Sequence, residues 1–143
     1  MPDEDFAPHQ EALDLKHLGF DEAISTYYSF PDIELSYVMD GHSKVSVRRN
    51  SQFGHAVSAP TYSQAFRFFR KRYGLHTWVA CRTILDNGKP IYIGCGRTIP
   101  DTLKDGFVVD IIHYEPKDTP EEAELYLLRK LIEIAKQQCN EKV

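Results

Sequence analysis

Cysteine, tryptophan and long apolar runs are all scarce in this chain. Its 143 residues include three cysteines (Cys81, Cys95 and Cys139) and a single tryptophan. The cysteine number is odd and no pair has the spacing Cys-x-x-Cys, which argues against a disulfide framework and favours a reducing compartment. Cys81 and Cys95 could face each other across a hairpin, but the favoured interpretation is that they are two small buried hydrophobes. No apolar stretch approaches the ~20 residues that span a bilayer, and the acidic start of the chain is not typical of a secretory signal. We therefore expect a cytoplasmic protein without a membrane partner.

Motifs that bind metals or carry out catalysis are also missing. The six histidines are scattered and none belongs to a His-Glu-x-x-His pattern, so no metal or cofactor is expected. His17 lies near Asp21 and Glu22, and Asp110 lies near His113, but such spacings arise often by chance. No glycine-rich phosphate loop, nucleophile elbow or paired-carboxylate motif accompanies them. The sequence predicts that the protein is not an enzyme.

What the chain does contain indicates one ordered domain of 16.5 kDa, with 42% apolar and 12% aromatic residues. Its charges are segregated along the sequence. The net charge is −9 over residues 1–40, +9 over residues 41–97 and −4 over residues 98–143. The middle block could form a basic face for an anion. The favoured interpretation is that the acidic flanks fold back and neutralise it.

The N-terminal part is predicted as an α-β-β segment over residues 9–49, after a tail at residues 1–8. Gly19 ends the helix, and Asp40-Gly41 is typical of a hairpin turn. Its elements are expected at 9–18 (helix), 24–28, 33–39 and 45–47 (strands). A polar loop at 50–60 is the best candidate for a boundary between two parts of the domain.

The C-terminal part, residues 60–138, is predicted as α-β-β-β-α. Thr61 with Gln64 and Thr119 with Glu122 have the spacing of capping boxes that begin helices. Gly94 and Gly96 suggest a bulge or the close approach of another backbone. The elements are expected at 61–73 (helix), 78–85, 91–95 and 107–114 (strands) and 119–138 (helix).

Together these elements predict a single α+β domain over residues 1–143. A mostly antiparallel sheet would carry the helices 61–73 and 119–138 on one face, and the hairpin 33–48 would extend or flank that sheet. The apolar residues of the last helix cover about half its circumference, which is wider than a surface helix needs. This width implies either deep burial or a dimer contact.

Four strings in fixed order carry a resemblance to a known group of proteins. They are Leu18-Gly19-Phe20-Asp21-Glu22, Ala59-Pro60-Thr61-Tyr62-Ser63-Gln64-Ala65-Phe66, Phe69-Arg70-Lys71-Arg72-Tyr73-Gly74-Leu75, and Glu121-Glu122-Ala123-Glu124 leading to Leu131-Ile132-Glu133-Ile134. In this order they resemble small uncharacterised proteins of Bacteroides-type genomes and prophages, over about residues 15–136. The resemblance implies an origin in a mobile element and transfers no catalytic residue.

Nucleic-acid binding is one hypothesis, because the αβββα order is similar to a double-stranded-RNA-binding domain. Phosphates would be contacted by the basic residues of helix 61–73 and the adjacent strands: Arg67, Arg70, Lys71, Arg82, Lys89 and Arg97. The acidic turn Thr119–Glu124 stands where that family places lysines, and it would repel phosphate. The alternative is an ordinary solvated basic helix face.

The favoured hypothesis is a non-catalytic protein-interaction module of phage or prophage origin. Its partner is unknown, and self-association is plausible for it. The predicted contact residues on the last helix are Leu128, Leu131, Ile132 and Ala135. The aromatic residues Tyr27, Tyr28, Phe30 and Tyr37 are further candidates. The alternative for both sets is that they form the core.

Overall fold

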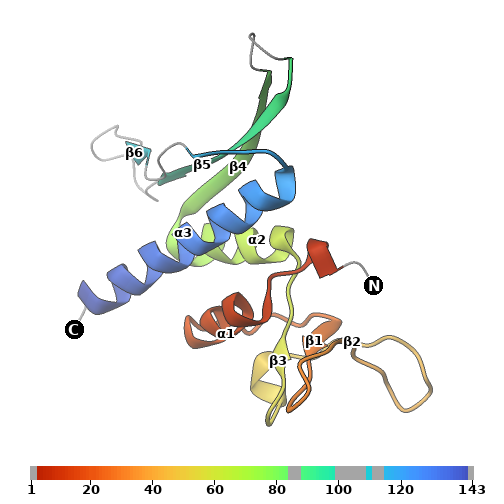
Figure 1. Ribbon diagram of the computed structural model, residues 1–143. Helices are drawn as coiled ribbons and strands as arrows, with labels where there is room; N and C mark the ends of the chain where they lie inside the picture. Colours follow the sequence, from red (N-terminus) through yellow and green to blue (C-terminus); the bar gives the residue numbers. More distant parts are fainter. Residues whose placement is uncertain (1–2, 84–87, 99–108, 111–114, 142–143) are drawn as a thin grey trace. The chain divides into compact units, whose positions relative to one another are not determined.

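The computed structural model describes residues 3–83, 88–98, 109–110 and 115–141. It is an α+β fold with α-helices and two antiparallel sheets (Figure 1). The chain divides into two compact units, residues 1–65 and 66–143, and the division lies inside a helix rather than in the 50–60 loop. The predicted single sheet is thus replaced by one sheet in each unit. The predicted 33–48 hairpin belongs to the first of them.

Unit 1 packs a short helix, α1 (His9–His17), on a sheet ordered β2-β1-β3. The strands are β1 (Thr26–Tyr28), β2 (Leu35–Tyr37) and β3 (Val57–Ser58). Two 3₁₀ helices, η1 (Asp3–Asp5) and η2 (Asn50–Gln52), lie before α1 and before β3. The helix ends as predicted, because Gly19 follows its C-cap with a φ of 96°. The 50–60 loop was not expected to contain β3, which pairs with β1.

Buried polar groups hold the unit 1 loop in place. The Asn50 side chain donates to Phe20 O at 2.7 Å, and its Oδ1 accepts from Ser58 N at 2.8 Å. Thr26 Oγ1 donates to Ala59 O at 2.6 Å. Because each bond ends on the backbone, these side chains satisfy main-chain groups that burial would otherwise leave unpaired. They fix the end of the 50–60 loop against β1 and the α1–β1 connection.

Unit 2 is built on a long antiparallel pair of strands. The helix α2 (Tyr62–Tyr73) ends at Gly74, which has a φ of 66°, and β4 (Leu75–Thr83) begins at the next residue. β5 (Pro90–Thr98) pairs with β4 over nine residues without a bulge. Both strands are longer than the predicted segments 78–85 and 91–95. The short strands β6 (Val109–Asp110) and β7 (Pro116–Lys117) both pair with β5.

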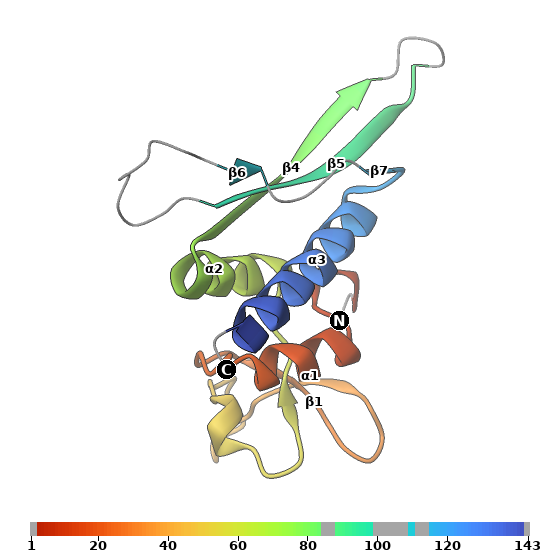
Figure 2. The same cartoon turned by 90° about the vertical axis from the view of Figure 1, so that its left-hand side faces the viewer.

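The last helix, α3 (Pro120–Glu141), packs across the β4–β5 pair (Figures 1 and 2). Thr119 Oγ1 accepts from Glu122 N at 3.2 Å, which confirms the predicted start of this helix, with Pro120 at its first position. The capping box of α2 is complete, because Thr61 and Gln64 exchange both bonds. Of the predicted strand 107–114, only Val109 and Asp110 lie among the described residues.

The helix α3 approaches β5 closely at Gly94. A methyl group at this position would lie 2.6 Å from Leu127 Cγ, and Leu127 is fully buried. The prediction for the Gly-Cys-Gly string is a bulge or the close approach of another backbone. The ladder has no bulge at Gly94, and the group that approaches it is the side chain of Leu127. Glycine is needed here for space, since any Cβ would overlap the leucine.

Candidate interaction surfaces

The predicted self-association residues of α3 are part of the core. Leu128, Leu131 and Ala135 are 0% exposed and Ile132 is 4% exposed. The sequence left two explanations open for the wide apolar stripe, deep burial and a dimer contact. The structure shows that the stripe is buried within this chain. A partner surface in this conformation has to be formed by other residues.

The basic residues proposed for nucleic-acid binding are all exposed. Arg67, Arg70 and Lys71 lie on α2, and Arg70 and Lys71 belong to its last turn. Cations in that position also suit the negative end of the helix dipole, so α2 has a structural reason for them. The remaining three lie on or beside the strands of unit 2: Arg82, Lys89 and Arg97. Whether acidic segments neutralise this basic set stays a prediction.

The register of β4 and β5 places two of the basic residues on one face with the single tryptophan. Residues directly opposite each other in an antiparallel ladder share a face. The pairs Trp78–Cys95 and Arg82–Ile91 therefore lie on the same face as Arg97, which pairs with His76. The guanidinium carbon of Arg97 lies 5.5 Å from the centroid of the Trp78 ring, and Trp78 is 44% exposed. Sequence reasoning had not included Trp78 in any site.

Unit 1 carries an exposed apolar surface on the hairpin that follows β2. Met39 and Val45 form an antiparallel bridge, and Ser46 N donates to Val38 O at 2.8 Å. This register puts the odd-numbered residues on one side of the hairpin. Their exposed fractions are 47% for Tyr37, 50% for Met39, 58% for Val45 and 58% for Val47. We call these four residues the hairpin stripe.

The turn of this hairpin is held by one carboxylate. Asp40 Oδ1 accepts from His42 N at 2.7 Å and from Lys44 N at 2.9 Å, which confirms the predicted turn at Asp40-Gly41. The left-handed residue is Ser43, with a φ of 60°, rather than the glycine. The predicted strand 45–47 is present only as a bridge at Val45, and a second bridge lies just beyond it, at Arg48. Figure 1 shows the hairpin projecting from the sheet of unit 1.

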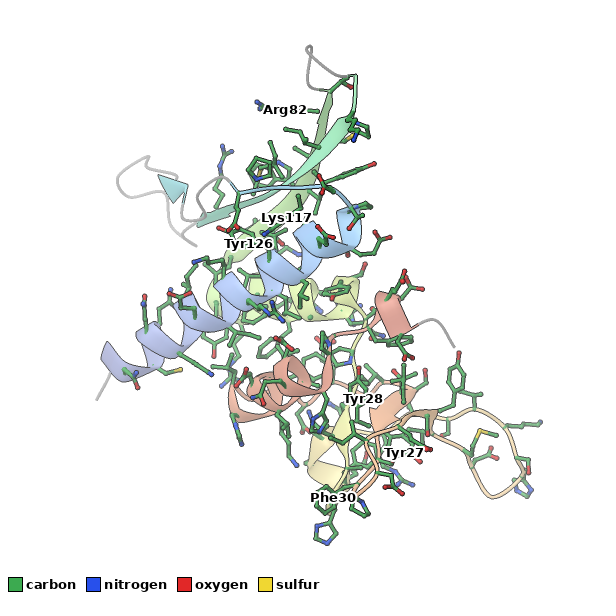
Figure 3. The ribbon with its side chains drawn as sticks, in the orientation of Figure 1. Tyr27, Tyr28, Phe30, Arg82, Lys117 and Tyr126 are labelled. Atoms are coloured by element: carbon green, nitrogen blue, oxygen red, sulfur yellow. The ribbon has the colours of Figure 1, made fainter. Side chains whose placement is uncertain are left out.

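The four aromatic candidates divide between core and surface, and Figure 3 labels Tyr27, Tyr28 and Phe30 among them. Tyr27 packs against Phe53, with ring centroids 5.3 Å apart. Tyr28 is buried against α1 and donates to Ala7 O at 2.6 Å, and burial is the main cause that raises its pKa. Phe30, at 67% exposed, and Tyr37 remain accessible. Of this predicted set, Tyr28 belongs to the core, Tyr27 is partly buried, and Phe30 and Tyr37 lie on the surface.

Clusters that could hold a metal ion are not found in the described part of the chain. Among residues 3–83, 88–98, 109–110 and 115–141, no three histidine, cysteine or acidic side chains are placed to hold a metal. The Asp21 carboxylate, one of the acid–base candidates, accepts from Ser51 N at 2.8 Å and Ser51 Oγ at 3.0 Å and so holds a loop. His113, another candidate, lies outside the described residues.

The three cysteines are free thiols. Cys81 lies opposite Tyr92, whereas Cys95 lies opposite Trp78, so the two do not face each other across the ladder as they could have done. Cys81 is exposed and Cys95 partly so, which differs from the expected pair of buried hydrophobes. Of the helices in the described segments, none is both long enough and apolar enough to cross a membrane.

Comparisons with protein-family models, with curated proteins and with solved structures find no match to this chain. The chemistry of the surfaces described above therefore carries the functional argument.

Proposed function

We propose that the protein is a non-catalytic protein-interaction module that binds its partner through the hairpin stripe. The observation that carries this proposal is the gathering of Tyr37, Met39, Val45 and Val47, each about half exposed, on one side of a projecting hairpin. Single exposed apolar residues are common, but a contiguous group marks an interaction site more often than chance. The origin in a mobile element and the cytoplasmic location remain predictions from the sequence.

The energetic reason is the apolar area that a partner would cover. Full burial of one such side chain contributes about 1.5–3 kcal/mol. Because each of the four is already about half buried, covering the stripe would contribute about 3–6 kcal/mol before the entropy of association is subtracted. Because association costs about 4–15 kcal/mol in lost translational and rotational freedom, the stripe would supply the centre of the contact and neighbouring residues would have to add to it.

The surroundings of the stripe have the composition of an interface rim. Asp40, His42 and Lys44 form the exposed turn at its end, so the apolar centre is bordered by polar groups. The occupant we propose is a protein surface that presents apolar side chains to the stripe. A second copy of this chain would be one such surface, and it is distinguished by its crosslinked mass.

Site-specific photocrosslinking tests the proposal. A photoreactive phenylalanine analogue is placed at Val45, on the stripe, or at Ala23, an exposed control position in the same unit. The purified chain and the living cells that produce it are both irradiated. We expect a defined crosslinked protein product from position 45 that is absent from position 23. Equal products from both positions, or none from position 45, would contradict the proposal.

Charge substitutions provide the matched control. Val45→Lys in the presence of a probe at Met39 should abolish the crosslink, because it places an ammonium group within the apolar contact. His42→Lys adds the same group at the exposed turn and should leave the crosslink intact. Both positions are exposed, so neither change should alter the unfolding transition, which is measured alongside. A crosslink that survives Val45→Lys would refute the role of the stripe.

A further inference from the structure

The β4–β5 pair has one face covered by a helix and a second face of different chemistry. Gly94 and its partner Val79 lie on the face that meets Leu127 of α3. Trp78, Arg82 and Arg97 lie on the other face. The acidic first turn of α3, which argued against duplex-RNA binding, belongs to the helix on the covered face. The Trp78 face therefore has to be judged by its own residues.

An exposed tryptophan ring in contact with an arginine offers a flat surface on which a nucleobase can stack. The Arg97 guanidinium carbon lies 5.5 Å from the centre of the Trp78 ring, within the range of a cation–π contact. This contact restricts the orientation of the indole, while 44% of the residue stays exposed. Every nucleobase has a flat π-face that can stack on such a ring, whatever the sequence.

Cations lie beyond the tryptophan along the same strands. Arg82 is four residues from Trp78 in β4, which corresponds to about 14 Å at ~3.4 Å per residue. Figure 3 shows Arg82 on the part of the hairpin that extends beyond α3. Lys89, also exposed, immediately precedes β5 at this end of the ladder. Such a distance lets one strand of a few nucleotides place a base on Trp78 and phosphates beside Arg82 and Lys89.

We propose that this face binds single-stranded nucleic acid. One base stacks on Trp78, Arg97 orients the indole, and Arg82 and Lys89 contact phosphates. A duplex is disfavoured because its bases are already stacked and paired, so the indole would have no base face to contact. An acidic peptide would use the cations but would leave the aromatic platform without a role. This surface lies in unit 2 and is independent of the hairpin stripe in unit 1.

The single tryptophan makes the test direct, because all intrinsic tryptophan fluorescence comes from this face. The full chain is titrated with short oligo-dT and oligo-rU, with the matching duplexes and with poly-glutamate. We expect saturable quenching by the single strands. A plot of log affinity against log salt should have a slope of about −1.4, from two phosphate contacts at about −0.7 each on a single strand.

Variants assign the roles, with binding measured by the anisotropy of a labelled oligonucleotide. Trp78→Ala should weaken binding about 5- to 150-fold, as expected for the loss of one base stack, whereas Trp78→Phe should keep most of the affinity. Arg82→Ala and Lys89→Ala should each reduce the salt slope by about 0.7. Arg129→Ala removes an exposed cation from α3 and should change neither quantity. Urea unfolding confirms that each variant remains folded.

Three results would overturn the inference. One is the absence of any quenching or anisotropy change with single strands at low salt. Another is binding of poly-glutamate as tight as that of the oligonucleotides, which would indicate an acidic protein partner. The third is tighter binding of a duplex than of its single strand. None of these results bears on the crosslinking experiment at Val45, because that probe lies in the other unit.

Discussion

The contact of β5 with α3 at Gly94 allows a quantitative test of how unit 2 is packed. In Gly94→Ala, the new methyl carbon would lie 2.6 Å from Leu127 Cγ and 3.1 Å and 3.3 Å from its two methyl carbons. Leu127 is fully buried, and the closest atom is its branch point rather than a flexible end. The leucine cannot therefore yield by a simple rotation, and either the helix or the strand must shift.

The expected magnitude combines two opposing effects. Overpacking of a well-packed core costs about 1–3 kcal/mol. Replacement of glycine by alanine in a strand recovers about 0.5–1 kcal/mol of conformational entropy. We expect Gly94→Ala to lower the free energy of unfolding by about 1–2 kcal/mol. Urea titration followed by Trp78 fluorescence measures this value, since the reporter lies in the strand paired with β5.

A double-mutant cycle distinguishes this contact from a general intolerance of substitution. Leu127→Ala alone should cost about 2–5 kcal/mol through the cavity that it leaves. In the double variant the added methyl group occupies part of that cavity, so the loss should be smaller than the sum of the single losses. Gly54→Ala serves as control, because a methyl group there meets no atom within 4 Å. Wild-type stability of Gly94→Ala, or strict additivity in the cycle, would refute the packing argument.

Three further substitutions test unit 1. Asn50→Ala should lower the free energy of unfolding by about 2–4 kcal/mol, because two buried backbone groups lose their partner. Urea unfolding followed by circular dichroism measures this value. A loss under about 0.5 kcal/mol would contradict the prediction. Burial and then the charges of Asp3 and Glu11 raise the pKa of Tyr28 above 10.0. The contribution of Tyr28 to the free energy of unfolding should thus be complete below about pH 10 and decrease above it. In alkaline urea titrations, Tyr28→Phe should remove that decrease. An unchanged pH profile would refute the assignment. Ser43→Gly should raise the free energy of unfolding by about 0.5–1 kcal/mol, because the φ of 60° suits glycine better than serine. The thermal midpoint should therefore rise, and a lower midpoint would contradict this.

Local chemistry explains why the helix boundaries could be predicted from the sequence. The starts of α2 and α3 follow from Thr61 and Thr119, whose hydroxyls accept from backbone groups three residues later. The end of α1 follows from the positive φ at Gly19. These signals depend only on neighbouring residues. The split into two sheets depends on which distant strands pair, as in the pairing of β3 with β1, and no local pattern specifies it.

Which face of a strand is buried was harder to predict from the sequence. The alternation over residues 33–39 predicts a strand with Tyr37 and Met39 on its apolar side. In the structure Leu35 on that side packs against the core, but Tyr37 and Met39 are about half exposed, and Val38, on the opposite side, is 4% exposed. Periodicity identifies the two faces of a strand, but the position of the covering elements decides which face is buried. The hairpin stripe and the Trp78 face could therefore be found only from the register.

Two kinds of residue in this protein reverse the usual rule of apolar residues inside and polar residues outside, and they differ in what explains them. The buried polar side chains of Asn50 and Thr26 each bond a main-chain group within unit 1, so the stability of the fold accounts for them. The exposed side chains of Met39, Val45 and Trp78 have no such account, since exposure forfeits the burial energy that apolar residues supply. A residue that the fold does not require where it lies is the best guide to function, and for that reason both proposals are placed on these residues.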